Sequence, residues 1–250
     1  MVLWLLLLAL FGCLVLLTQW ITRHIQGIGY LLTGDGRIAL TLYFVLILPG
    51  VLVHEASHAL AAWLLRVQVR HLELGIRRKA SQEQVALGSV HIADTDPIRS
   101  SLIGLAPLLA GIGAILLISD LALGLRSLVA PDAQGVWQAL RNTLQTPDFA
   151  VWAYLVFAIG NAMLPSTADR RSWVSALVLA AFLGALALFS GLLKAVAAPL
   201  GQWLRVAADQ LTYACAVTVV VDLVMAIGVF AAEQALGLLG FGRLEYRRRS

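Results

Sequence analysis

The chain contains few charged residues and almost no cysteine. Only 13% of its 250 residues are charged, whereas about a quarter are charged in a typical soluble protein. With 60% hydrophobic residues, it has too little polar surface for a soluble enzyme, a disordered chain or a nucleic-acid-binding protein. The two cysteines, Cys13 and Cys215, lie in apolar runs, which argues against a disulfide framework or a cysteine-based zinc site. The composition therefore predicts a protein embedded in a lipid bilayer, with no nucleic-acid partner.

Apolar stretches recur along the whole chain, and a bilayer crossing needs about 20 helical residues. Six stretches are candidates for crossing: residues 2–22, 38–65, 100–119, 149–165, 173–196 and 211–240. The first lacks a basic leader and a small-residue cleavage site, so we interpret it as an uncleaved anchor and not as a signal peptide. We predict one all-α polytopic membrane domain over residues 1–250. It has a core at 38–172 and accessory helices at 1–22, 173–196 and 211–240.

Two segments between these stretches alternate partly between apolar and polar residues. Residues 67–76 and 84–93 follow this strand-like pattern, and the polar segment Arg77–Glu83 separates them. A small membrane-associated β-hairpin after the second helix is therefore expected. Residues 132–145, around Trp137, predict a short amphipathic helix at the membrane interface.

The lysine and arginine residues lie mainly in short segments between apolar runs, where they set the orientation of a membrane protein. With six spans and both termini in the cytoplasm, twelve of the eighteen basic residues fall on the inner side. The outer side then holds Arg23, Arg37, Arg126, Arg141, Lys194 and Arg205. We therefore expect an integral protein of a prokaryotic plasma membrane with both termini in the cytoplasm.

The second apolar stretch contains the sequence His54-Glu55-Ala56-Ser57-His58. Residues four apart lie on one face of a helix, so His54 and His58 can bind one Zn²⁺ through their imidazole nitrogens. Glu55 is then placed to accept a proton from a water molecule that the metal activates. Chance gives roughly 0.002 matches to this pattern in a chain of this composition, and ionisable residues within a membrane usually mark function. The alternative is a set of polar side chains that pair with neighbouring helices without a metal.

Catalytic zinc generally takes three protein ligands, and no third histidine follows the motif at a fixed offset. The candidate acids near membrane depth are Asp169, Asp222 and Glu233. Asp222 is either a ligand or a hydrogen-bond partner between helices, and Glu233 lies near enough to the end of its stretch to face water.

Asp169 follows the end of the fourth stretch, on the side of the membrane where the topology also places the histidines. Pro165 disfavours helical geometry just before it, and irregular backbone at membrane depth is tolerated where it lies within protein. Asp169 is therefore placed to complete the site. The alternative is a loop acid paired with Arg170 or Arg171.

The chain resembles the site-2 protease family of intramembrane zinc metalloproteases. The resemblance is carried by His54-Glu55-Ala-Ser-His58 and, about a hundred residues later, by Asn161-Ala-Met-Leu-Pro165 followed by Asp169. It covers roughly residues 38–172, and Gly104-Leu-Ala-Pro107 is weakly similar to an Ala-Gly-Pro motif of the family. The aspartate is followed by Arg170, whereas the family usually has glycine there, and Pro165 stands one position later than usual.

The resemblance implies that His54, His58 and Asp169 bind Zn²⁺, that Glu55 is the catalytic base, and that Asn161 helps to position the substrate peptide. The expected function is hydrolysis of peptide bonds in or near transmembrane segments of membrane protein substrates. The partners are then such a substrate and the lipid bilayer. The alternatives are a catalytically inactive membrane-embedded binding or scaffold protein of the same fold, or a metal-binding transporter.

Overall fold

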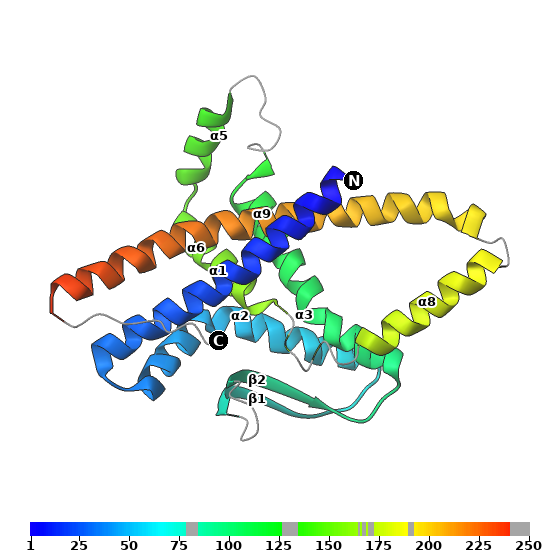
Figure 1. Ribbon diagram of the computed structural model, residues 1–250, viewed down its shortest axis with the longest axis horizontal. Helices are drawn as coiled ribbons and strands as arrows, with labels where there is room; N and C mark the ends of the chain where they lie inside the picture. Colours follow the sequence, from blue (N-terminus) through cyan, green and yellow to red (C-terminus); the bar gives the residue numbers. More distant parts are fainter. Residues whose placement is uncertain are drawn as a thin grey trace.

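A computed structural model describes residues 1–78, 85–126, 135–164, 166, 169, 173–189 and 193–240. The chain is mostly helical, with an antiparallel two-stranded sheet beside the helices (Figure 1). Its elements, in chain order, are α1 (Val2–Thr33), α2 (Gly36–Leu64), β1 (Val69–Arg78), β2 (Val85–Ile92), α3 (Pro97–Leu117), the π-helix η1 (Ile118–Ala122), α5 (Gly135–Leu144), α6 (Phe149–Ala162), α8 (Trp173–Phe189) and α9 (Leu193–Leu238). Residues 79–84, which include most of the predicted segment between the strands, lie outside the described residues, as do Pro165, Arg170, Arg171 and the basic residues after 240. Arg77 and Arg78, which were predicted to belong to that segment, lie in β1.

Within the part of the chain that the structure describes, four helical segments are long and apolar enough to cross a membrane. They are Val2–Thr33, Gly36–Leu64, Pro97–Ala122 and Ala197–Leu238. These segments identify an integral membrane protein and match four of the six predicted stretches. The other two stretches contain α6 and α8, which have 14 and 17 residues. At 1.5 Å per residue α6 is about 21 Å long, which is less than the ~30 Å thickness of a bilayer core.

The first helix is longer than the sequence prediction. It continues past residue 22 to Thr33 and ends at Gly34, whose φ of 68° lies in the left-handed region that favours glycine. His24 therefore lies within α1. Helix α2 follows at once, and the Asp35 carboxylate accepts a hydrogen bond from the Arg37 N–H (2.7 Å), which caps its start.

Helices α1 and α9 pack along each other in the same direction (Figure 1). Leu14 shares a core cluster with Ala214, Ile21 packs with Met225 in the next cluster, and His24 bonds to Glu233. Residue numbers therefore increase together along both helices. Strict alternation of six spans requires the first and sixth to run in opposite directions, so the structure differs here from the predicted topology.

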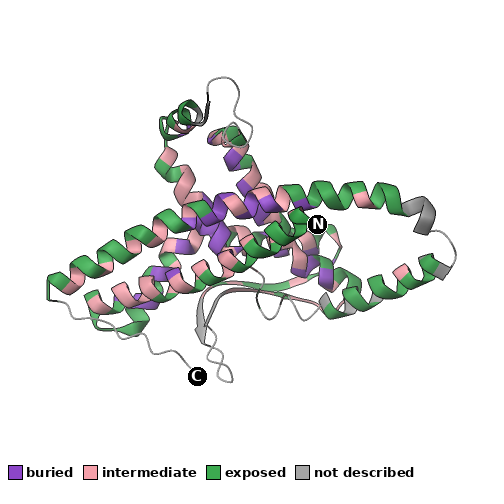
Figure 2. Cartoon of the chain, turned by 45° about the horizontal axis from the view of Figure 1, so that its top comes forward, coloured by how far each residue is buried: buried purple, intermediate pink, exposed green. Residues whose placement is uncertain are grey.

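Helix α6 occupies the centre of the bundle, where buried residues are concentrated (Figure 2). A Cβ atom at Gly50 of α2 would overlap the Ala158 carbonyl of α6. On another side, a Cβ atom at Gly160 of α6 would overlap the Thr218 side chain of α9. Glycine at these positions lets the backbones approach closely, as small residues do between membrane helices. The last turns of α6 are therefore held tightly between α2 and α9.

The predicted β-hairpin within residues 67–93 is confirmed. Strands β1 and β2 pair antiparallel, with Val69 opposite Ile92 and His71 opposite His91. The hairpin lies along α2 (Figure 1), and both of its strands contact that helix. The short helix predicted around Trp137 is also present, as α5.

Candidate metal centre

Helix α2 carries the His-Glu-x-x-His motif into the interior of the bundle. Glu55 and His58 are both buried, and His54 is nearly so. The two imidazole rings lie edge to face, with centroids 5.0 Å apart, as expected for residues four apart on a helix. The Ser57 hydroxyl donates to the His54 carbonyl (2.6 Å) and so finds its partner within the helix. The predicted placement of the three polar residues on one helix within the membrane domain agrees with the structure.

Both histidines are oriented by backbone carbonyls of neighbouring helices. His54 Nδ1 lies 2.8 Å from the Ala162 carbonyl oxygen, and His58 Nδ1 lies 2.9 Å from that of Ile103. A carbonyl only accepts, so each Nδ1 donates and its proton is fixed on that nitrogen. The lone pair of a neutral imidazole is then on Nε2, which is the arrangement found in histidines that bind metals.

Each of these two carbonyls is free to accept from a histidine because no N–H of its own helix donates a hydrogen bond to it. Ala162 is the last residue of α6, where carbonyl groups lack a partner further along the helix. Ile103 lies in the interior of α3, and its carbonyl would normally accept from the N–H of residue 107. That residue is Pro107, which has no N–H.

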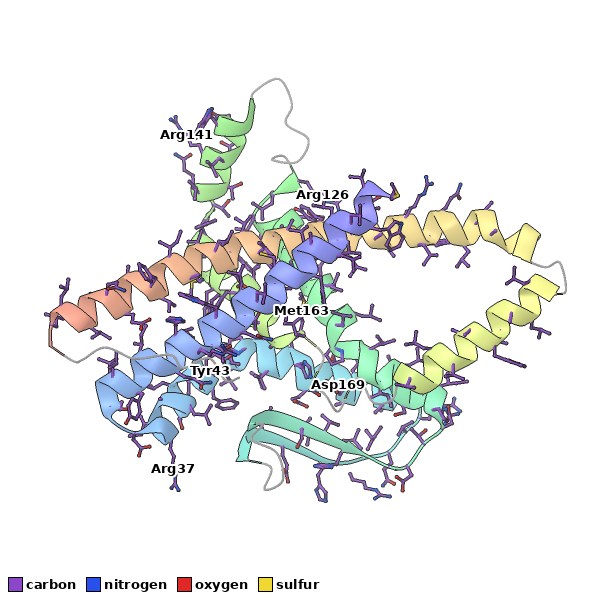
Figure 3. All side chains as sticks on the ribbon, viewed as in Figure 1. Arg37, Tyr43, Arg126, Arg141, Met163 and Asp169 are labelled. Carbon is purple, nitrogen blue, oxygen red and sulfur yellow. The ribbon has the colours of Figure 1, made fainter. Side chains whose placement is uncertain are left out.

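The Asp169 carboxylate lies next to both Nε2 atoms. Its Oδ1 is 3.2 Å from His58 Nε2 and its Oδ2 is 3.7 Å from His54 Nε2. Figure 3 shows Asp169 beside α2 and α3. The aspartate is held locally by Ser166, whose N–H donates to Asp169 Oδ2 (2.8 Å) and whose hydroxyl accepts from the Asp169 N–H (3.3 Å).

Electrostatics at Asp169 favour the carboxylate. Burial acts to raise the pKa of this carboxyl group, but a His58 ring that carries a proton on both nitrogens, through its hydrogen bond and its charge, and the Ser166 groups hold the pKa below its ordinary value. Asp169 therefore provides an ionised oxygen atom beside the two histidines, where it can act with them as a metal ligand.

The three residues fit a metal ion. One ligand atom from each of His54, His58 and Asp169 can be chosen so that all three lie within 4.8 Å of one another. Zn–N and Zn–O bonds of about 2.1 Å in a tetrahedral site place neighbouring ligand atoms about 3.4 Å apart. Each histidine Nε2 has one Asp169 oxygen near that spacing: Oδ1 lies 3.2 Å from His58 Nε2, and Oδ2 lies 3.7 Å from His54 Nε2. Two imidazole nitrogens and one carboxylate are also a donor set typical of catalytic zinc.

Glu55 lies against the hairpin. A Cβ atom at Gly88 of β2 would be 2.5 Å from Glu55 Oε1, so the strand approaches the carboxylate more closely than any larger residue allows. The sequence analysis did not find this contact, because no pattern in β2 marks the position of Gly88. The hairpin thus forms one wall of the site.

Asn161 is buried one residue before Ala162, but it faces α9. Its Nδ2 donates to the Phe157 carbonyl and to Asp222 Oδ1, both at 2.9 Å. Asp222 is fully buried and forms the hydrogen bond between helices that was one of its two predicted roles. Asp169 and not Asp222 joins the group that fits a metal.

The remaining candidate, Glu233, is paired elsewhere. Its Oε2 lies 2.5 Å from His24 Nδ1, and the His24 ring stacks on Trp20 with centroids 3.9 Å apart. This pair links α1 to α9. On the hairpin, His71 and His91 are exposed cross-strand partners.

Comparisons of the chain with models of protein families, with curated proteins and with solved structures found no match.

Proposed function

We propose that this protein is an intramembrane zinc metalloprotease that hydrolyses peptide bonds in or near transmembrane segments of membrane protein substrates. The observation that carries the proposal is the convergence of His54, His58 and Asp169, with Glu55 next to the first histidine on the same helix. The resemblance to site-2 proteases assigns the same residues to the same roles. The buried Glu55 beside the candidate metal ligands can act as the base in hydrolysis, whereas a scaffold or a transporter has no need of a base.

His54, His58 and Asp169 would hold the zinc ion. When bound, zinc supplies Lewis acidity, which polarises a peptide carbonyl and lowers the pKa of a water molecule towards about 7. Glu55 accepts a proton from the attacking water as its oxygen bonds to the scissile carbonyl carbon. The same carboxyl group then passes the proton to the leaving amine as the C–N bond breaks.

The substrate has to unwind locally, because a helix keeps its carbonyl groups hydrogen-bonded within its own backbone. An extended peptide can add as a strand to an exposed sheet edge. The hairpin offers such edges beside the site, since Gly88 of β2 contacts Glu55 and Leu72 of β1 is exposed. A photocrosslinker at Leu72 is expected to capture a bound transmembrane substrate. If Leu72 and positions along β2 never do so, this docking mode is excluded.

Metal content and cleavage together test the proposal. Purified wild type is expected to hold one zinc ion per chain, and His54→Ala and Asp169→Ala are expected to lose it. Glu55→Gln is expected to keep the zinc and to lose cleavage of a transmembrane substrate. A Glu55→Gln variant that cleaves as fast as wild type would contradict the assignment of the base. Zinc bound by a wild-type chain that cleaves no transmembrane substrate would favour the scaffold or the transporter.

Two features predict different sides of the membrane for the C-terminus. The basic residues predict the cytoplasm for both ends of the six-span arrangement. The common direction of α1 and α9 instead favours opposite sides for the two ends, because an odd number of crossings would then separate them. A topology reporter fused after Ser250, compared with one fused before Met1, distinguishes the two arrangements.

A further inference from the structure

Pro107 lies in α3 at the point where that helix faces the motif of α2. Its side chain is fully buried, and Ile103, one turn earlier, is also buried. A proline in a helix interior typically costs about 3 kcal/mol, because it removes one hydrogen bond and its ring crowds the carbonyl four residues before it. The carbonyl affected here is that of Ile103, which is the hydrogen-bond acceptor of His58 Nδ1 (2.9 Å).

We propose that Pro107 is a positioning residue of the metal site: by withholding the N–H that would occupy the Ile103 carbonyl, it leaves that oxygen to orient His58. This inference rests on the proposed metal site and extends it to a residue that touches neither metal nor substrate.

The Ile103 carbonyl has different hydrogen-bond partners depending on whether position 107 carries an N–H or a proline. With an N–H at position 107, the carbonyl would accept the regular helical hydrogen bond and point along the helix axis. With proline, the carbonyl is displaced from the axis and its lone pairs are open to a donor from outside α3. The His58 ring is that donor, so its Nδ1 proton and the direction of Nε2 towards Asp169 are fixed together. Outer partners of this kind typically change metal affinity 10–100-fold when they are removed.

Pro107→Ala is the direct test, because it restores the N–H and removes the ring. We expect zinc affinity to fall about 10-fold or more, while the thermal unfolding midpoint of the metal-free protein stays the same or rises. The opposite signs of these two changes separate positioning from a general structural role. With Co²⁺ in place of zinc, the d–d absorption bands of the variant are expected to shift, since the His58 ligand is no longer held in one orientation.

A matched control is available in α9, where Pro199 also lies inside a helix. Pro199→Ala is expected to leave zinc affinity and the cobalt spectrum unchanged. A second variant separates the effect of the missing N–H from the effect of the proline ring. It replaces residue 107 by lactic acid, which forms an ester in the backbone and so lacks both the N–H and the ring. The ester is expected to recover most of the affinity that Pro107→Ala loses.

The outcomes are distinct. Pro107→Ala with wild-type zinc affinity and an unchanged cobalt spectrum would overturn the role of Pro107 while leaving the proposed protease intact. An ester variant as weak as Pro107→Ala would show that the ring, and not the missing N–H, orients His58, and would overturn the inference as stated. A wild-type chain that binds zinc but cleaves no transmembrane substrate would overturn the proposed protease alone. A wild-type chain that binds no zinc would overturn both.

Discussion

Replacing Gly88 by alanine tests whether the hairpin sets the position of the Glu55 carboxylate. The added Cβ atom would lie 2.5 Å from Glu55 Oε1, whereas ordinary contacts begin at 3.4 Å. The carboxylate or the strand must therefore move by about 1 Å, and a displacement of that size in a catalytic group can cost roughly 100-fold in rate. We expect the kcat for a transmembrane substrate to fall about 100-fold in Gly88→Ala.

The metal ligands are not displaced by this change, so zinc content should stay at the wild-type level. The assay is single-turnover cleavage of a labelled transmembrane peptide in detergent or in vesicles, with zinc measured on the same sample. Gly113→Ala is the matched control, because a Cβ atom at Gly113 meets nothing within 4 Å. Cleavage by Gly88→Ala at the wild-type rate would refute the reasoning, since the carboxylate position would then not matter or the strand would yield freely.

Three further sets of substitutions test contacts between the helices. Gly50→Ala is expected to lower the free energy of unfolding by about 1–3 kcal/mol, because the added Cβ atom overlaps the backbone of α6; unchanged stability in a denaturation assay would contradict this contact. His24→Leu and Glu233→Leu are each expected to cost about 1–3 kcal/mol, and the double variant is expected to cost less than the sum, as a double-mutant cycle will measure. Asp222→Leu is expected to destabilise the protein by a similar amount, about 1–3 kcal/mol, because the Asn161 amide loses its acceptor. Asp222→Asn keeps an acceptor and is expected to keep most of the stability. Equal losses in the two variants would argue against the hydrogen bond.

The site residues that the sequence analysis identified are side chains whose spacing or depth has a direct geometric meaning. His54 and His58 follow from the helical period, and Asp169 follows from its position after the fourth stretch. The hairpin also follows from its alternating pattern and the polar segment between its strands. In each case a local rule relates residue order to position.

What the sequence analysis missed depends on backbone atoms and on contacts between distant segments. The carbonyls of Ala162 and Ile103 orient the histidines, but every residue has a carbonyl and no side chain marks these two. Pro107 was noted only as part of a weak motif, although counting back four residues from it identifies the exposed carbonyl once His58 is known to be near. The direction of α9 relative to α1 was missed because hydropathy gives the length of a helix and not the helix against which it packs.

The tight fit of α6 between its neighbours limits how a long substrate can reach the zinc ligands. A methyl group added at Gly50 of α2 or at Gly160 of α6 would overlap the neighbouring helix. Helix α6 therefore cannot slide or rotate without separating from α2 and α9. In the proposed protease, the substrate is therefore expected to enter along the hairpin, whose strands contact α2. The packed helices would then hold the site residues in place, while the sheet would receive the incoming peptide.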